Sequence, residues 1–98
     1  MVNHVVTFKF KGDAQTRLEV AKKFKAALDE LPRLINELQS IEVGINQNPK
    51  EDWDLTLTAK VASMEDVATY AVHPAHVAAV QIIKDHKEAR ACVDYITE

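Results

Sequence analysis

The spacing of apolar residues switches between two periods along this 98-residue chain, and these switches constrain the fold more than any other feature. Residues 2–11 alternate, which is the period of a half-buried strand. The side chains that point one way are those of Val2, His4, Val6, Phe8 and Phe10. Residues 14–39 instead carry apolar side chains at three- and four-residue steps, the period of an amphipathic helix. The sequence therefore predicts a strand followed by a helix.

Cap and turn residues mark the ends of the first elements. Asp13 is suited to be the N-cap of the helix, and Pro32 predicts a kink or a second short helix because proline cannot donate to the preceding turn. Two more alternating segments, 40–47 and 53–61, flank the turn-forming residues 46–50. They are predicted to pair as a hairpin.

The last third of the chain repeats the order of helix and strand. A capping signal at Ser63 opens a helix, and His73-Pro74 interrupts it because proline disfavours helix at the preceding residue. A second helix is predicted at roughly 74–88 and a last strand at about 90–96.

The resulting order, β-α-β-β-α-β, is the split arrangement of ferredoxin-like α+β folds. Residues 1–98 are therefore expected to form a single domain, with helices on one face of a four-stranded antiparallel sheet. The other face stays uncovered, and its mixed side chains fit either a solvated face or a dimer interface that tolerates polar groups. These side chains are Val5, Thr7, Lys9, Thr56, Thr58 and Lys60.

Composition narrows the class of partner and the compartment. The formal net charge of -3 argues against nucleic acid, whose phosphates require a basic surface. No run approaches the roughly 18 apolar residues of a membrane helix, and the N-terminus does not resemble a signal peptide. A single cysteine, Cys92, cannot form an internal disulfide, so a cytoplasmic location is expected. On its strand Cys92 is expected to be an inert small hydrophobe.

The segment Tyr70-Ala71-Val72-His73-Pro74-Ala75-His76 resembles the Tyr-x-x-His-Pro-x-His block of the stress-responsive α/β-barrel (Dabb) domain family. The resemblance runs from about residue 2 to residue 96 and includes residues 1–11 and Val93-Asp94-Tyr95. It implies a homodimer in which two sheets meet face to face and close an α/β barrel with the helices outside. The uncovered sheet face then acquires a partner.

The same resemblance suggests an activity. One plant member of the family is a polyketide cyclase that catalyses an intramolecular aldol condensation without a metal. Its Tyr and the second His of the block act together, and they carry over as Tyr70 and His76; its N-terminal pocket His carries over as His4. A further pocket His of the cyclase falls where this chain has Leu55.

The residue types themselves fit proton transfer. An imidazole can abstract a proton from a carbon flanked by carbonyls near neutral pH, and a Tyr hydroxyl can stabilise the enolate that forms. His76 and Tyr70 are therefore the candidate catalytic residues. The expected pocket between sheet and helices is lined by His4, Val6, Phe8, Leu28, Leu57, Val80 and Ile83. In the alternative interpretation, His76 binds a backbone carbonyl and locks the helix junction, while His73 satisfies a free backbone group at a helix start.

No metal or cofactor is expected. His4, His73 and His76 could together hold zinc, but a histidine pair spanned by Pro74 has poor geometry for it. Three hypotheses remain for function. The first is a protein that binds a small, partly apolar molecule without catalysis, and the second is a cofactor-independent cyclase, lyase or isomerase. The third, a small monooxygenase of the same dimeric barrel fold, rests on the fold alone.

Overall fold

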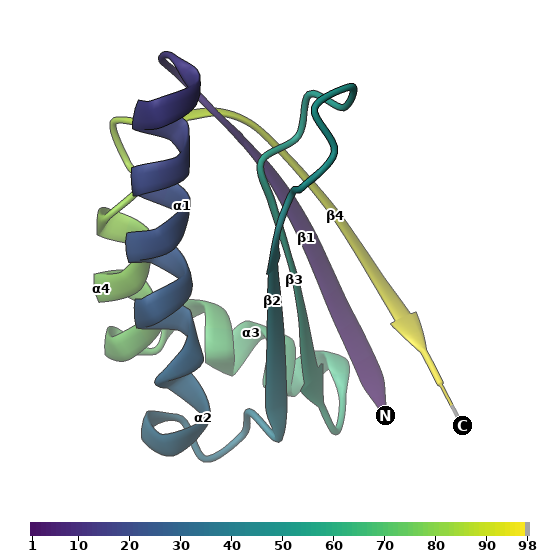
Figure 1. Cartoon of the computed structure of the whole chain (residues 1–98). Helices are drawn as coiled ribbons and strands as arrows, with labels where there is room; N and C mark the ends of the chain where they lie inside the picture. The colour runs from purple at the N-terminus through teal and green to yellow at the C-terminus, as the bar shows by residue number, and fades with distance from the viewer. Residues whose placement is uncertain (98) are drawn as a thin grey trace.

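The computed structural model describes residues 1–97 and shows helices packed on one face of a sheet (Figure 1). Its elements are, in order, β1 (Val2–Phe10), α1 (Ala14–Asp29), α2 (Leu31–Leu34), β2 (Ser40–Ile45), β3 (Leu55–Val61), α3 (Met64–Val72), α4 (Pro74–Gln81) and β4 (Lys87–Ile96). The strands lie in the order β2-β3-β1-β4, and every neighbouring pair is antiparallel. This is the predicted ferredoxin-like α+β fold, with each helical segment broken into two helices.

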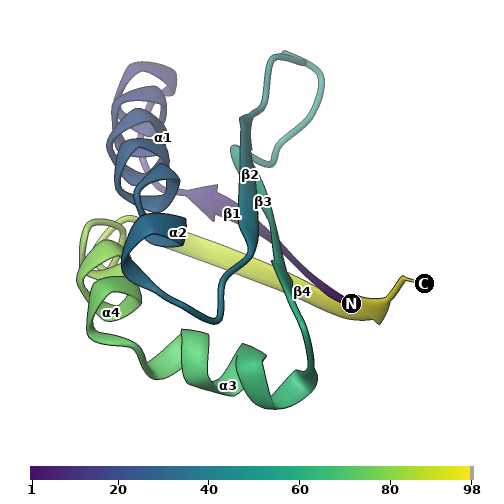
Figure 2. The same ribbon diagram turned by 90° about the horizontal axis from the view of Figure 1, so that it is seen from below.

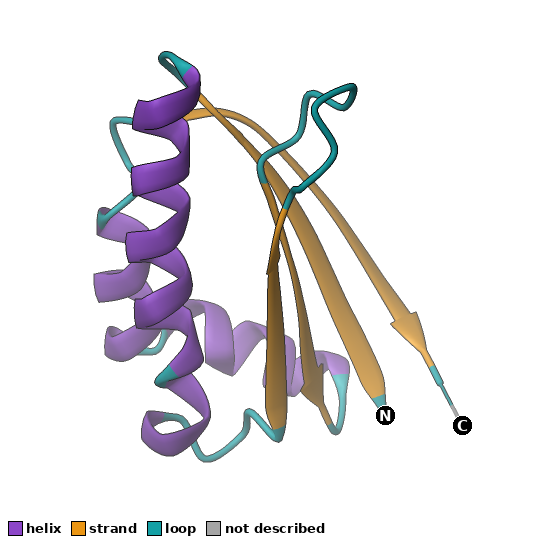
Figure 3. Cartoon of the chain, in the orientation of Figure 1, coloured by secondary structure: helices purple, strands orange, loops and turns teal. Residues whose placement is uncertain are grey.

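The core lies between the helices and the inward face of the sheet. Figure 3 shows the helices in purple on one side of the orange strands, and Figure 2 shows the same separation from below. The alternation predicted for β1 is observed, because Val6, Phe8 and Phe10 are buried while the residues between them are only partly so. From α1, Phe24 enters this core with 1% of its surface exposed. Replacing such a ring with alanine costs about 3–5 kcal/mol.

Both predicted proline breaks are present, but both helical segments end earlier than the apolar spacing suggests. Pro32 lies in the first turn of α2, which stops at Leu34 because Ile35 is already extended. The expected continuation to residue 39 is therefore wrong. The segment after Pro74 also ends early, at Gln81 rather than 88, since Lys87 and Ala89 already pair with β1 as part of β4. Strand pairing with β1 overrides the local helical pattern there.

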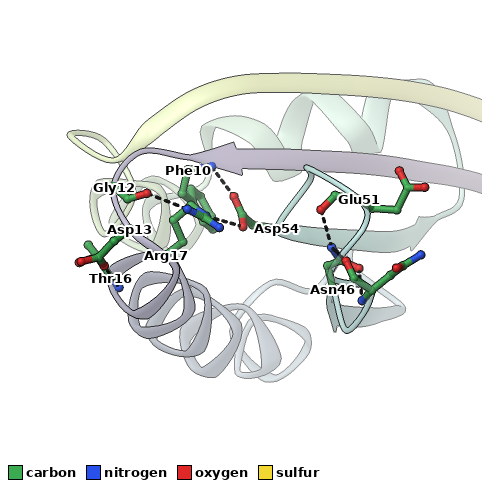
Figure 4. A network of polar contacts seen from close by, with 9 residues as sticks. Phe10, Gly12, Asp13, Thr16, Arg17, Asn46, Glu51 and Asp54 are labelled. Atoms are coloured by element: carbon green, nitrogen blue, oxygen red, sulfur yellow. Dashed lines mark hydrogen bonds and ion pairs between the residues drawn. The ribbon is translucent and has the colours of Figure 1, made fainter.

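A polar network fixes the end of β1 against the start of α1 and β3 (Figure 4). The Asp54 carboxylate accepts a 2.7 Å hydrogen bond from the Phe10 backbone N–H and one of 3.2 Å from Arg17 Nε. Arg17 Nη1 also donates to the Gly12 carbonyl at 2.7 Å, and Asp13 caps α1 as predicted. These bonds position the strand that carries His4 relative to α1.

The helices leave one sheet face and most of β4 uncovered. Val93, Tyr95 and Ile96 of β4 are 62%, 47% and 74% exposed. On the same face as Val93, Thr7 and Thr56 hydrogen-bond to each other across the sheet at 3.0 Å. Within residues 1–97, no helix combines the length and the apolar character that crossing a bilayer requires.

Candidate functional site

A cavity of about 180 Å³ lies between the sheet and the helices. Its apolar lining comes from Val6, Phe8, Phe24, Leu57, Ala71, Val80 and Ile83, and its polar lining from His4, Tyr70, His76, Lys87 and Arg90. Larger hollows occur beside the loop 46–54 and on the bare sheet face, but they are wider and more open grooves. Of these hollows, the cavity between sheet and helices is the least open and the one that brings histidines and a tyrosine together, so we take it as the candidate site.

Tyr70 lies at the centre of the polar lining. Ser63 is the N-cap of α3, and its hydroxyl accepts from the Asp66 N–H. The helix carries Tyr70 near its end, with 1% of the Tyr70 surface exposed. The Tyr70 ring contacts His4 edge-on, with centroids 5.8 Å apart, and His76 on the other side, at 4.5 Å. The break at Pro74 brings Tyr70 and His76 together, as their spacing requires.

The Tyr70 hydroxyl is buried and has no hydrogen-bond partner among residues 1–97. Leaving a buried hydroxyl unpaired costs about 1–3 kcal/mol. Burial also raises the pKa of Tyr70 well above its usual value, so the group keeps its proton. Tyr70 is therefore an available donor for an oxygen of a molecule in the cavity.

His76 has one ring nitrogen engaged and one available. Its Nδ1 lies 2.9 Å from the Ala71 carbonyl oxygen, which can only accept, so Nδ1 carries the proton and Nε2 carries the lone pair. Burial lowers the pKa of His76; the bond to Ala71 opposes this shift, and the positive charges of His4, Arg90 and His73 add to it. His76 is thus neutral near pH 7 and can act as a base. In the alternative interpretation His76 binds a backbone carbonyl, and the bond to Ala71 is of this kind, but it leaves Nε2 available.

His4 is oriented by a carboxylate from the neighbouring strand. The register of β1 on β4 places His4 opposite Asp94, and His4 Nδ1 lies 2.5 Å from Asp94 Oδ1. Because a carboxylate only accepts, His4 Nδ1 carries a proton in this bond, and Nε2 is the acceptor when the ring is neutral. Hydrogen bonds of this kind hold a histidine in one tautomer and one orientation.

The histidines considered for zinc do not converge, because His73 caps α4 by accepting the Ala75 N–H at 3.0 Å. Instead His4, Asp94 and Cys92 bring three donor atoms within 4.8 Å of one another. Cys92 Sγ lies 3.6 Å from His4 Nδ1 and 3.9 Å from Asp94 Oδ1. A metal ion there would have to replace the His4–Asp94 hydrogen bond.

Cys92 was expected to be an inert small hydrophobe on a central-type strand, but β4 lies at the edge of the sheet. Cys92 is exposed, because the inward face of this edge strand lies beyond the helices. Partial burial and the neighbouring Asp94 carboxylate raise the pKa of its thiol, so the thiol is protonated and unreactive at neutral pH. Cys92 is therefore inert because its thiol stays protonated, and not because it is packed as a small hydrophobe.

The structure places eight of the nine sequence-predicted site residues at the cavity, and Leu28 is the exception. Leu28 is fully buried in the core, and Phe24, one turn earlier on α1, supplies the contact with the cavity. Sequence reasoning missed Lys87, Arg90 and Asp94. These three residues could have been found only from the pairing of β4 with β1, since residues directly opposite each other share a face.

Comparison with known proteins gives a family model and similar structures. The model described as Stress responsive A/B Barrel Domain (Dabb) matches residues 2–97. None of the curated proteins matches the chain. A dimeric protein of unknown function with a ferredoxin-like fold, from Bacteroides fragilis, is 43% identical; the match covers 98% of this chain and 95% of that one, with a TM-score of 0.94.

Two enzymes share the fold at low identity. A hydroxynitrile lyase from Passiflora edulis is 16% identical, with coverage of 99% of this chain and 93% of that one and a TM-score of 0.77. An antibiotic biosynthesis monooxygenase is 11% identical, with coverage of 100% and 99% and a TM-score of 0.80. At these identities the likeness concerns the fold alone.

Proposed function

Because this chain belongs to the Dabb family of stress responsive A/B barrel domains, we propose that its cavity binds a small, partly apolar carbonyl compound. We further propose that His76 and Tyr70 move a proton on that compound without a cofactor. The observation that carries this proposal is the buried, unpartnered Tyr70 hydroxyl, whose ring packs against His76. A polar group left unpaired in an apolar cavity is what a ligand oxygen would satisfy.

The proposed step is abstraction of a proton next to a carbonyl. His76 Nε2 takes the proton, and the electron pair of the broken C–H bond forms an enolate. The Tyr70 hydroxyl donates a hydrogen bond to the enolate oxygen. The imidazolium then returns its proton to the same or another carbon of the molecule, which is isomerisation. Alternatively the carbanion attacks a second carbonyl of the same molecule, which is cyclisation, and the imidazolium protonates the alkoxide that forms.

His4 has a positioning role in this scheme. Its hydrogen bond to Asp94 holds the ring beside Tyr70, and its Nε2 is the nitrogen left to accept a hydrogen bond. The non-catalytic interpretation uses the same cavity and differs only in the absence of proton transfer. Experiment can separate the two.

The test is deuterium exchange of phenylacetone in D₂O, followed by proton NMR. We expect the wild-type protein to accelerate exchange at the carbons beside the carbonyl, and His76→Gln to lose this acceleration by about 10²-fold or more. His86→Gln is the matched control, because His86 does not line the cavity. Binding of phenylacetone without any acceleration would favour the non-catalytic interpretation.

A homodimer, with the bare sheet faces packed together, is also part of the proposal. The protein from Bacteroides fragilis is described as dimeric. The exposed apolar side chains of β4, among them Val93 and Tyr95, give a second copy a surface to cover. A cytoplasmic location stays a proposal based on the single cysteine.

A further inference from the structure

Two cations, Lys87 and Arg90, belong to the polar part of the cavity lining. Both lie near the start of β4. Residues three apart on a regular strand point to opposite faces. Here the register on β1 shifts: Phe10 pairs with Lys87 while Lys9 pairs with Ala89, so residue 88 is extra. This irregularity turns Lys87 to the same inward face as Arg90, as bulges near functional sites often do.

Neither cation is neutralised within the described chain. None of the ion pairs among residues 1–97 includes Lys87 or Arg90. Asp94 is the carboxylate on the same face of β4, and its Oδ1 is held by His4. The charge of Arg90 reaches the catalytic candidates, since it contributes to the lowered pKa of His76. The cavity thus has uncompensated positive charge beside its proton-transfer pair.

The dimensions of the cavity limit the rest of the ligand. A volume of about 180 Å³ is close to the ~150 Å³ apolar cavity that accommodates benzene in another protein. The walls that Phe8, Phe24 and Leu57 provide suit a flat or branched apolar body. Arginine binds carboxylates in a bidentate manner, and lysine adds a second, more flexible charge.

We propose that the compound bound in this cavity is a small carboxylate with an apolar body about the size of one aromatic ring, its carboxylate held by Arg90 and Lys87. This inference rests on the proposed function, because it assigns the substrate class of the same cavity. The carbonyl on which His76 and Tyr70 act is then a keto group of that acid.

The test compares phenylacetate with phenylacetamide, which has the same body without the charge, by calorimetric titration of the full-length protein. We expect phenylacetate to bind at least about tenfold more tightly. The substitution Arg90→Gln should remove most of this preference, and Lys87→Gln should reduce it. Arg33→Gln is the matched control, because Arg33 is exposed, lies on α2 and pairs with Glu30.

Several results would overturn the inference: equal affinity for the two compounds, binding of neither, or a preference that survives loss of both cations. Tighter binding of phenyl phosphate than of phenylacetate would show that the carboxylate assignment is wrong. The proposed function is tested separately. A preference for phenylacetate that depends on Arg90, without accelerated deuterium exchange of phenylacetone, supports this inference and contradicts the proton transfer. Accelerated deuterium exchange of phenylacetone, without a preference for phenylacetate over phenylacetamide, supports the proton transfer and contradicts this inference.

Discussion

The ring of Tyr70 packs against that of His76 with their centroids 4.5 Å apart, although six positions separate them in the sequence. On one continuous helix these residues would lie on different faces. The chain instead ends α3 at Val72 and starts α4 at Pro74, and the turn between them redirects His76 toward Tyr70. The same turn brings the Ala71 carbonyl to His76 Nδ1, which sets the tautomer that a base requires.

Removing the Tyr70 hydroxyl should separate its proposed role in proton transfer from any structural one. Because the group is buried and unpartnered among residues 1–97, Tyr70→Phe should leave the free energy of unfolding unchanged or raise it by about 1 kcal/mol. The acceleration of deuterium exchange in phenylacetone should fall by about 10²-fold in this variant. Urea denaturation and exchange kinetics measure the two effects. A loss of stability above about 1 kcal/mol would instead show that the hydroxyl is hydrogen-bonded in the folded protein.

The lowered pKa of His76 gives stability a defined dependence on pH. Burial is the main cause, so the folded protein binds this proton less readily than the unfolded chain, whose His titrates near 6.5. The stability from neutral His76 is therefore complete above pH 6.5 and is lost as the pH falls toward the folded pKa. We expect the slope of unfolding free energy against pH in this window to flatten in His76→Gln. An unchanged slope would mean that His76 titrates normally.

Arg90 should modulate the same titration. Its charge disfavours protonation of His76, so Arg90→Gln should raise the pKa of His76. The shift can be measured from the His76 ring resonances by NMR. Arg33→Gln is the control, because it removes a positive charge that does not contribute to the lowered pKa of His76. A His76 titration that Arg90→Gln leaves unaltered would place the guanidinium away from the cavity.

Asp94 should determine the tautomer of His4. In the wild-type protein, nitrogen NMR shifts should report a protonated Nδ1 in neutral His4, because the Asp94 carboxylate accepts from it. Asp94→Ala should shift the His4 ring toward the Nε2–H tautomer and slow deuterium exchange of phenylacetone. Asp94→Asn should affect the tautomer and the exchange less, because its amide oxygen still accepts. The same tautomer in wild type and Asp94→Ala would remove this positioning role.

The bare sheet face can be tested through the oligomeric state. Light scattering after size exclusion should show a dimer for the wild type and a monomer for Val93→Lys, since the substitution would put two like charges into the proposed interface. Val72→Lys is the matched control, because Val72 is exposed at the end of α3 on the helix side. A wild-type monomer would refute the face-to-face packing.

Much of the fold could be predicted because alternation and proline breaks are local signals. The alternating strand β1 and the breaks at Pro32 and Pro74 are where the sequence predicts them. Apolar spacing did not predict the ends of α2 and α4. The first ends where Ile35 becomes extended, and residues after the second pair with β1 in β4.

The candidate site divides in the same way. His4, Tyr70 and His76 were predictable from their residue types and from the resemblance of the Tyr70–His76 block to a known family. The contributions of Lys87, Arg90 and Asp94 depend on the register of β4 and on the extra residue 88. Register is a long-range property that no local pattern in β4 specifies, so these three side chains required the structure.

An NMR titration with acetophenone, a small ketone with one aromatic ring, tests whether the cavity beside Tyr70 and His76 binds carbonyl compounds. If the cavity is the binding site, the ring resonances of Tyr70 and His76 should shift together and saturate, and Tyr70→Phe should weaken the binding. The contradicting result is shifts confined to the larger open groove around Asn46 and Asp54, with the Tyr70 and His76 resonances unmoved.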